Sequence, residues 1–425
     1  MKRVDGYLAR YADVRAVDAA ARVRGAFSAA VVIPARDETP AVLERCAPAL
    51  AGRDALAIIV VNGDADDPVR VHEANAALLS ALLAHGASTP LAPGLALVAT
   101  AAATLLVVDC ASASRWLPVG QGVGRARRIG CDIALALWRR GVVARRFLDT
   151  TDADATLPAD YFDAGDHRAV AVTRSFTHVP SGDTAIDQAT ALYELTLRYY
   201  VAGLASAGSP WSMHTIGSCI AVDADAYATA RGLPLRPAGE DFYLLAKVAK
   251  LGRVDRGAGA PVRIESRRSA RVPFGTGPGA ALIAETLEAG GVPAVYDPAS
   301  FVALGRTLEA IGRWTATPGA RLRIEGDDVL AAALTETGLV AGVERAAAQA
   351  KTPAQRLRKS MEWLDAFRTL KLIHALRSQG HTPVPWPRAV AALAGEVMDV
   401  VAANEALTRL EADAPDAGLY AQRVG

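Results

Sequence analysis

Short runs of apolar residues alternate with longer amphipathic stretches between about residues 27 and 265. The apolar runs are rich in valine, isoleucine and alanine, which is typical of strands that are buried on both faces. Strands are predicted at residues 29–33, 57–61, 105–108, 142–148 and 169–173, with weaker signals at 216–222 and 253–254. Helices are predicted at residues 39–50, 68–85, 124–139, 184–204 and 240–251. This alternation predicts an α/β fold, Rossmann-like, with a mainly parallel sheet and helices on both faces.

The pattern changes on both sides of this region. Residues 1–26 are charged and helix-like, without the apolar segment that a secretory signal carries. Beyond about residue 275 the strand signals fade, and Ala/Leu/Arg/Glu helical patterns continue to the C-terminus. We therefore predict an N-terminal helical extension (1–26), a sheet-bearing domain (27–270) and a mainly α-helical C-terminal region (271–425).

One segment has the length of a membrane span. Residues 91–108 carry no charged side chain, and eighteen residues just reach the length that a span needs. The segment contains Pro93 and Gly94, however, and it ends in an apolar run directly before Asp109. We interpret it as a helix or loop that leads into a core strand.

The charge balance restricts the partners. Lys and Arg total 46, and Asp and Glu total 45, so the chain has no long-range field that would attract nucleic acid. The four cysteines are widely spaced and form no CxxC pair, which is typical of buried thiols in a reducing compartment. We expect a cytoplasmic protein that does not bind nucleic acid.

Carboxylates follow the fourth predicted strand. Asp152 and Asp154 are one residue apart, so in an extended segment both point to the same side. A hard divalent cation such as Mg²⁺ or Mn²⁺ takes oxygen ligands and often bridges to substrate phosphates. This pair therefore favours metal-assisted handling of a diphosphate, and the alternative is a solvated acidic turn before Pro158.

Two further segments have anion-binding character. Residues 34–38 follow the first strand, where backbone amides and Arg36 can hold a base or a phosphate; the alternative is an ordinary turn that caps the next helix. Residues 120–128 join a glycine-rich turn to a helix start that bears three arginines. Such a helix start suits phosphate, and the alternative is a solvated arginine-rich face.

Later segments supply candidates for proton transfer and acceptor binding. Glu240 and Asp241 stand at a predicted helix start, where they act either as helix caps or as a general base. Trp211 and His214 precede a strand and can line an acceptor pocket, although a loop histidine is often only structural.

In this order, the segments resemble a family-2-like glycosyltransferase of the GT-A fold. The matching stretches are Val-Val-Ile-Pro-Ala-Arg-Asp-Glu (31–38), Val-Val-Asn-Gly-Asp-Ala-Asp-Asp (60–67), Gly-Val-Gly-Arg-Ala-Arg-Arg-Ile-Gly (122–130), Thr-Asp-Ala-Asp-Ala-Thr-Leu-Pro (151–158), Ile-Gly-Ser-Cys-Ile-Ala-Val (216–222) and Gly-Glu-Asp-Phe-Tyr-Leu (239–244). The resemblance covers residues 27–270 and leaves out the helical C-terminal region.

The resemblance implies a nucleotide-sugar donor, UDP- or GDP-linked, a hydroxyl acceptor and a divalent metal, Mn²⁺ or Mg²⁺. By this likeness Asp152 and Asp154 hold the metal, and Asp241, with Glu240 beside it, is the catalytic base of an inverting transfer. The implied donor-binding residues are Pro34, Ala35, Arg36, Glu38, Asn62, Asp64, Gly124, Arg125, Asp152, Arg268 and Arg271. The acceptor-binding candidates are Trp211 and His214.

Two departures from the family pattern narrow the expectation. The family often has Asp or Asn at the position of Val61, and the Gln-x-x-Arg-Trp motif of processive synthases is absent from this sequence. We therefore expect a single sugar addition. A nucleotidyltransferase, a non-catalytic binding protein and a retaining transferase stay open as alternatives. The helical region is compatible with acceptor binding, a homodimer or peripheral contact with the inner face of the membrane.

Overall fold

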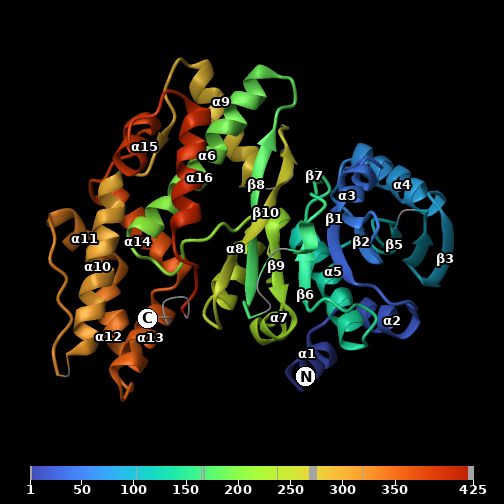
Figure 1. Ribbon diagram of the computed structural model, residues 1–425, viewed down its shortest axis with the longest axis horizontal. Coiled ribbons are helices and arrows are strands. Elements are labelled where there is room, and N and C mark those ends of the chain that lie inside the picture. Colours follow the sequence, from blue (N-terminus) through green and yellow to red (C-terminus); the bar gives the residue numbers. More distant parts are fainter. Residues whose placement is uncertain are drawn as a thin grey trace. The chain divides into compact units, whose positions relative to one another are not determined.

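The computed structural model describes residues 2–101, 103–163, 165, 168–236, 238–267, 275–317 and 319–419 (Figure 1). Its contacts divide the chain into two units. The sheet unit comprises Met1–Gly182, Thr215–Val248 and Asp255–Pro278. The helical unit comprises Asp183–His214, Ala249–Val254 and Gly279–Gly425.

Four strands in parallel form the centre of the sheet. They are β1 (Ala29–Ala35), β2 (Ala55–Asn62), β5 (Thr104–Cys110) and β6 (Phe147–Thr150). β1 pairs in parallel with both β2 and β6, and β2 pairs in parallel with β5. Every residue of β1 and β2 is buried, which fits the near-continuous apolar runs in the sequence.

Antiparallel strands flank this centre on both sides. They are β3 (Ala87–Ala92), β4 (Leu95–Ala99), β7 (Ala155–Thr156), β8 (Ala171–Val179), β9 (Ile220–Asp223) and β10 (Val254–Glu265). Within the described residues the sheet has ten strands in the order β3-β4-β5-β2-β1-β6-β9-β8-β10-β7. The predicted α/β fold is confirmed, and the sheet is mixed with a parallel centre.

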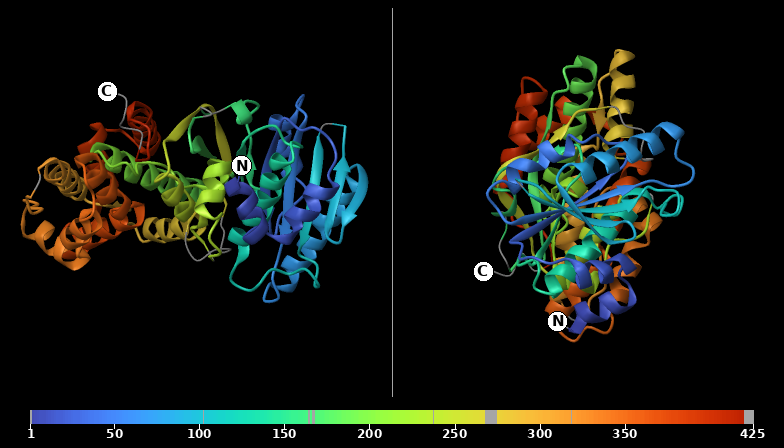
Figure 2. Two further views of the ribbon diagram at one scale, coloured as in Figure 1. Left: turned by 90° about the horizontal axis from the view of Figure 1, so that it is seen from below. Right: turned by 90° about the vertical axis from the view of Figure 1, so that its right-hand side faces the viewer.

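Helices cover both faces of the parallel strands. The helices and 3-10 turns of this unit are α1 (Lys2–Arg10), α2 (Val14–Arg22), α3 (Val42–Leu50), α4 (Val69–Ala84), α5 (Gly122–Arg139), η1 (Tyr161–Asp163), η2 (Gly217–Cys219), α7 (Ala224–Ala230) and α8 (Glu240–Val248). The β1-to-β2 and β5-to-β6 connections cross the sheet in opposite directions. Right-handed connections therefore place α3 and α5 on opposite faces, and blue helices lie on both sides of the blue strands in Figure 2.

The N-terminal helices are part of the sheet unit and are not a separate extension. The carboxylate of Asp132 in α5 is fully buried and accepts hydrogen bonds from the Tyr7 hydroxyl (2.7 Å), the Asp13 amide (2.9 Å) and the Tyr227 hydroxyl (3.0 Å). This one carboxylate joins α1, α2 and α7 to α5. Burial raises the pKa of Asp132 to about 6, although its hydrogen bonds and Arg128 oppose the rise.

The prediction for residues 91–108 is confirmed at its end, where β5 is a core strand, and wrong before it, where strands replace the expected helix or loop. The segment lies in an antiparallel meander, because β3 and β4 form a hairpin and β4 pairs with β5. Pro93 and Gly94 make the turn. Gly94 has a φ of 76°, as the third residue of a type II β-turn requires. Across the described helices, none is long and apolar enough to cross a membrane.

The helical unit confirms the predicted C-terminal helical region. Its helices are α6 (Thr184–Ser206), most of α9 (Thr276–Glu288), α10 (Pro298–Ala316), α11 (Asp328–Thr337), α12 (Leu339–Ala347), α13 (Pro353–Trp363), α14 (Ala366–Gln379), α15 (Trp386–Ala394) and α16 (Val400–Asp413). A small antiparallel pair joins β11 (Ala294–Val295) to β12 (Val384–Pro385). The core contains Phe301, Leu304 and Ile311 of α10 against Leu372 and Ile373 of α14.

The predicted boundary between the two parts differs from the observed one. Residues 183–214, which the sequence assigned to the sheet-bearing domain, belong to the helical unit. The reason is the packing of α6 against α16, α10 and α15 (Figure 1). Buried Leu195, Tyr199 and Leu204 of α6 are members of the same core as Phe301.

Candidate functional site

The candidate site lies at the carboxyl ends of the parallel strands. In the register, Ala35 at the end of β1 is opposite Val61 of β2, and Thr150 at the end of β6 is opposite Val32 of β1. The segments that follow these strands therefore start from one edge of the sheet, where ligands bind in open α/β sheets. They carry most of the side chains that the sequence predicted for a donor and a metal.

Asp152, directly after β6, is held on two sides. One carboxylate oxygen accepts from the Arg127 guanidinium at 2.8 Å, and the other accepts from the Ser218 hydroxyl at 2.8 Å. Burial would raise the pKa of Asp152, but the Arg127 guanidinium holds it below its ordinary value. Its side chain stays 33% exposed, so the carboxylate can still be reached by a ligand.

Arg127 reaches the site from α5 and is only 3% exposed. Besides Asp152, its guanidinium donates to the Glu240 carboxylate (3.1 Å) and to the Gly217 carbonyl (3.0 Å). Burial would lower the pKa of Arg127, but the surrounding carboxylates raise it above its ordinary value. Arg127 therefore links the end of β6 to the start of α8.

Glu240 and Asp241 begin α8, and their surroundings differ. Glu240 is 3% exposed and is bound by Arg127. Burial together with the negative charge of Glu240 raises the pKa of Asp241 to about 7, although Arg127 opposes the rise. A carboxylate with a pKa near neutrality can accept a proton efficiently at physiological pH.

Asp154 and Glu38 share a second arginine. The Arg267 guanidinium donates to both oxygens of Glu38, at 2.6 Å and 3.2 Å, and it also binds the Asp154 carboxylate. Burial raises the pKa of Asp154 to about 6, with Asp152 and Glu38 adding to the rise and Arg267 opposing it. Burial also raises the pKa of Glu38, again against the effect of Arg267. Through Arg267, Glu38 after β1 is therefore linked to Asp154 after β6.

Carboxylates outnumber cations in this cluster. Among the described residues, two guanidinium groups face five carboxyl groups, which belong to Glu38, Asp152, Asp154, Glu240 and Asp241. The excess of negative charge explains why burial leaves several of the pKa values raised. A bound cation would relieve this repulsion, and we call the five groups with Arg127 and Arg267 the carboxylate cluster.

The cluster fits a metal ion only in combination with a ligand. Within the described part of the chain, no group of three or more His, Cys, Asp or Glu side chains is arranged to hold a metal. Mg²⁺ and Mn²⁺, however, are commonly held by one or two carboxylates together with waters and substrate phosphates. Asp152 and Asp154 can supply two such carboxylates, provided that Arg267 leaves Asp154.

A polar edge next to the cluster connects β1 to β2. Arg36 binds the Asp67 carboxylate, and Asp67 also accepts from the Asp64 amide at 3.1 Å. The Asn75 side chain donates to the Asn62 carbonyl (3.1 Å) and accepts from the Asp37 amide (2.9 Å). These contacts fix the backbone of both turns. Pro34 and Ala35 are the last two residues of β1 and are buried.

Two predicted donor contacts on α5 have other neighbours. A side chain at Gly124 would meet the Arg236 carbonyl at 3.0 Å, so this glycine lets the Arg236 backbone lie close to the helix. Arg125 donates to Gln121 (3.2 Å) and lies 3.5 Å from the carboxylate of Asp13. Gly124 also lies beside Glu240 of the carboxylate cluster, since a Cβ there would be 3.4 Å from the Glu240 side chain. The contact of Gly124 and Arg125 with a donor stays a prediction.

The two acceptor candidates lie in the helical unit. Trp211 is 2% exposed, and its indole donates to the Leu364 carbonyl at 2.7 Å. His214 lies 2.9 Å from the carboxylate of Glu411, which also accepts from Arg198 at 3.1 Å. Both side chains have structural partners there, and their acceptor role stays a prediction. Arg268 and Arg271 lie outside the described residues.

Three residues that bind carboxylates of the cluster were not among the predicted site residues: Arg127, Ser218 and Arg267. A signal for Arg127 existed in the spacing of α5, because Gly130 follows three residues later on the same face. A side chain at Gly130 would come within 2.3 Å of Val32, so that face packs on β1 and directs Arg127 toward the strand ends. Ser218 lies in the matching stretch 216–222, and Arg267 directly precedes Arg268, a predicted donor contact, but neither position marks the side chain as a partner of these carboxylates.

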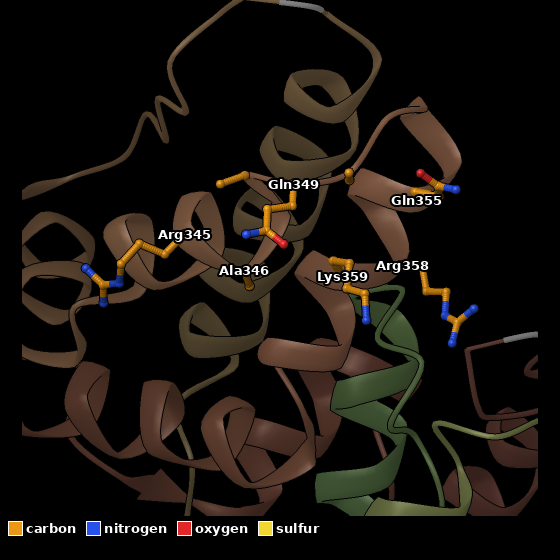
Figure 3. Close-up of a pocket in the computed structure, with 8 residues that line it drawn as sticks. Arg345, Ala346, Gln349, Gln355, Arg358 and Lys359 are labelled. Atoms are coloured by element: carbon orange, nitrogen blue, oxygen red, sulfur yellow. The ribbon is translucent and has the colours of Figure 1, made fainter.

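A separate hollow of about 690 Å³ lies in the helical unit, between α12 and α13 (Figure 3). Its lining includes Arg345, Gln349, Gln355, Arg358 and Lys359. The cationic groups do not converge, since Arg345 and Arg358 point apart in Figure 3. Arg358 and Lys359 both donate to Glu362, at 2.7 Å and 2.8 Å, so part of the positive charge is neutralised.

Neither a protein-family model nor a curated protein matches this chain. The functional argument therefore depends on the geometry of the carboxylate cluster.

Proposed function

We propose that the protein is a glycosyltransferase that moves a sugar from a nucleotide-diphosphate-sugar to an acceptor hydroxyl, with inversion and one sugar at a time. One observation carries the proposal: Arg127 binds both Asp152 after β6 and Glu240 at the start of α8. It thereby joins a carboxylate suited to a metal–diphosphate complex to the residue that precedes Asp241. A leaving-group site and a proton acceptor are the two parts that an inverting transfer needs.

In the proposed reaction, the acceptor oxygen forms a bond to the anomeric carbon while the bond to the diphosphate oxygen breaks. Asp241 takes the proton of the acceptor hydroxyl, which its raised pKa of about 7 suits. A divalent cation held by Asp152 and Asp154 would neutralise charge on the departing diphosphate. Arg127 keeps Asp152 ionised and oriented, because it is buried and has three fixed acceptors.

The donor would extend from the cluster along the polar edge of β1 and β2. The backbone of 34–38 and 62–64 and the Arg36 side chain would contact the nucleoside, UDP- or GDP-linked. The carboxyl ends of parallel strands are where ligands bind in open α/β sheets. We place the reaction in the cytoplasm, where nucleotide sugars and reduced thiols coexist; the four described cysteines are buried, as that environment allows.

The decisive experiment has two arms. First, nucleoside diphosphates and nucleotide sugars are screened by thermal shift with and without Mn²⁺, because a ligand of the folded state raises the melting temperature. Second, turnover of the best donor is measured for Asp241→Asn. We expect transfer to be lost while Mn²⁺-dependent donor binding persists.

Asp328→Asn is the matched control, because Asp328 is an exposed acid in the first turn of α11. Unchanged turnover in Asp241→Asn would refute the role of the base. Release of pyrophosphate from a nucleoside triphosphate would instead favour a nucleotidyltransferase. Absence of any nucleotide-dependent shift would favour a non-catalytic protein.

A further inference from the structure

Arg267 binds two carboxylates of the cluster, one of which the proposed function assigns to a divalent cation. Its guanidinium binds both oxygens of Glu38 and also the carboxylate of Asp154, which the proposed function assigns to the metal. One oxygen of Asp154, Oδ2, is therefore occupied by Arg267, and a cation that binds this carboxylate through Oδ2 must displace the guanidinium. The inference that follows rests on the proposed function.

The two arginines of the cluster differ in how firmly they are held. Arg127 is 3% exposed and has acceptors on three sides, including the Gly217 carbonyl at 3.0 Å. The Arg267 side chain is 27% exposed. Its guanidinium forms ion pairs with the carboxylates of Glu38 and Asp154. Arg267, which is partly exposed, can therefore exchange partners at a much lower free-energy cost than the buried Arg127.

We propose that Arg267 is an exchangeable counter-cation: it neutralises Asp154 and Glu38 in the ligand-free protein and passes from Asp154 to a diphosphate oxygen when metal and donor bind. The exchange keeps charge balanced, because the cation replaces the guanidinium on Asp154 as the diphosphate brings new negative charge. Arginine is suited to both partners, since its planar fork binds carboxylate and phosphate oxygens alike. Arg267 is thus a positioning residue for the diphosphate.

This exchange makes the binding of metal and diphosphate cooperative. Metal alone must displace the guanidinium from Asp154 without compensation, so its affinity is low. With a diphosphate present, the displaced guanidinium gains a phosphate oxygen, and the metal gains further ligands. Couplings between two ligands typically change affinity about 5- to 150-fold, and we expect a factor in this range.

The test measures Mn²⁺ binding directly, by electron paramagnetic resonance of the full-length protein, without any turnover. Isotherms are recorded with Mn²⁺ alone and with Mn²⁺ plus uridine or guanosine diphosphate. In Arg267→Met, we expect Mn²⁺ alone to bind about tenfold more tightly than in the wild type, because Asp154 is no longer occupied. The enhancement by diphosphate should fall by a similar factor.

Arg45→Met is the matched control. Arg45 donates to the Ala153 carbonyl (3.2 Å) and to Glu265 (2.7 Å). Arg45→Met therefore removes an equal charge beside Asp154, and the described hydrogen bonds of Arg45 do not involve the Asp154 carboxylate. We expect its Mn²⁺ isotherms to match those of the wild type. Equal tightening in both variants would overturn the proposal, because a general field effect would then suffice.

The remaining outcomes separate this inference from the proposed function. Wild-type Mn²⁺ affinity in Arg267→Met, with the diphosphate enhancement intact, overturns the exchange but leaves the transferase assignment standing. Absence of Mn²⁺ binding in all proteins, with or without diphosphate, overturns both. Arg267→Gln, which is also uncharged, repeats the measurement if circular dichroism shows that Arg267→Met does not fold.

Discussion

Replacement of Arg127 by methionine would test the electrostatic design of the cluster most directly. Methionine preserves much of the length and apolar stem of the side chain but removes the guanidinium. Asp152 and Glu240 then lose their shared cation, and the Gly217 carbonyl loses a donor. Glu240 has a side chain only 4% exposed, so water cannot replace the lost partner there.

The expected loss of stability follows from these contacts. Removal of one partner from a buried ion pair costs about 3–5 kcal/mol, because an uncompensated charge stays in the interior. Asp152 keeps 33% of its side-chain surface in water, which reduces its share of the cost. We therefore expect Arg127→Met to lose about 3–4 kcal/mol of unfolding free energy near neutral pH.

The loss should depend on pH. In the wild type the pKa of Asp152 is lowered, so this pair stabilises the fold above the ordinary carboxyl pKa and loses its effect as pH falls. In the variant, Asp152 keeps its burial but loses the guanidinium, so its pKa would rise. Protonation at about pH 5 would then relieve much of the penalty, so the difference between the proteins should shrink on acidification.

Urea denaturation at about pH 7.5 and about pH 5, followed by circular dichroism, measures this difference. Arg125→Met is the control, because Arg125 lies on the same helix with a side chain 31% exposed and should cost less than about 1 kcal/mol. A loss below about 1 kcal/mol in Arg127→Met at neutral pH, or a loss that does not change with pH, would refute the reasoning.

Three further predictions concern the same unit. If Asp241 is the base, kcat/KM should rise with pH through about 7 and then level off, since the pKa of Asp241 is raised to about 7; a profile flat from about pH 5 to 9 would contradict this. Asp132→Asn should cost about 2 kcal/mol because the amide keeps only one acceptor oxygen, so either the Tyr7 hydroxyl or the Asp13 amide loses its acceptor, and it should abolish the part of wild-type stability that falls as pH rises from 3.8 to about 6, both read from denaturation curves. Gly130→Ala should lower stability by about 1–3 kcal/mol because its new methyl group would meet Val32 at 2.3 Å, and Val32→Ala should recover part of the loss in a double-mutant cycle.

The strands that could be predicted are those with both faces buried. β1, β2 and β5 are near-continuous apolar runs, so their sequences leave little choice of structure. β10 extends eleven residues beyond Val254, but only its first position was predicted. Residues 257–261 read Gly-Ala-Gly-Ala-Pro and lack the apolar alternation of a half-buried strand, so only pairing with distant segments stabilises them as part of the sheet.

The candidate site was predictable where it follows the strand ends and not where it depends on helix rotation. Asp152, Asp154 and Glu38 could be grouped because parallel strands end at one edge. Three arginines lie close together at residues 125, 127 and 128, and the sequence favoured the first. Only the packing of Gly130 against Val32 turns Arg127 inward, while Arg128 donates to the Leu233 carbonyl at 3.0 Å.

The contacts of Glu240 and Asp241 bear on whether these two acids cap α8 or belong to the carboxylate cluster. A capping acid accepts from backbone amides two or three residues later in the helix. Glu240 instead binds the Arg127 guanidinium, and the backbone donor given for Asp241 is the adjacent Phe242 amide at 2.7 Å. Elsewhere in the same unit, Asp223 accepts from the amides of residues 225 and 226, as a cap does. Among the described contacts neither acid at the start of α8 follows that pattern, so capping does not account for them, and the role in the cluster that we propose for both stays open to the Asp241→Asn test.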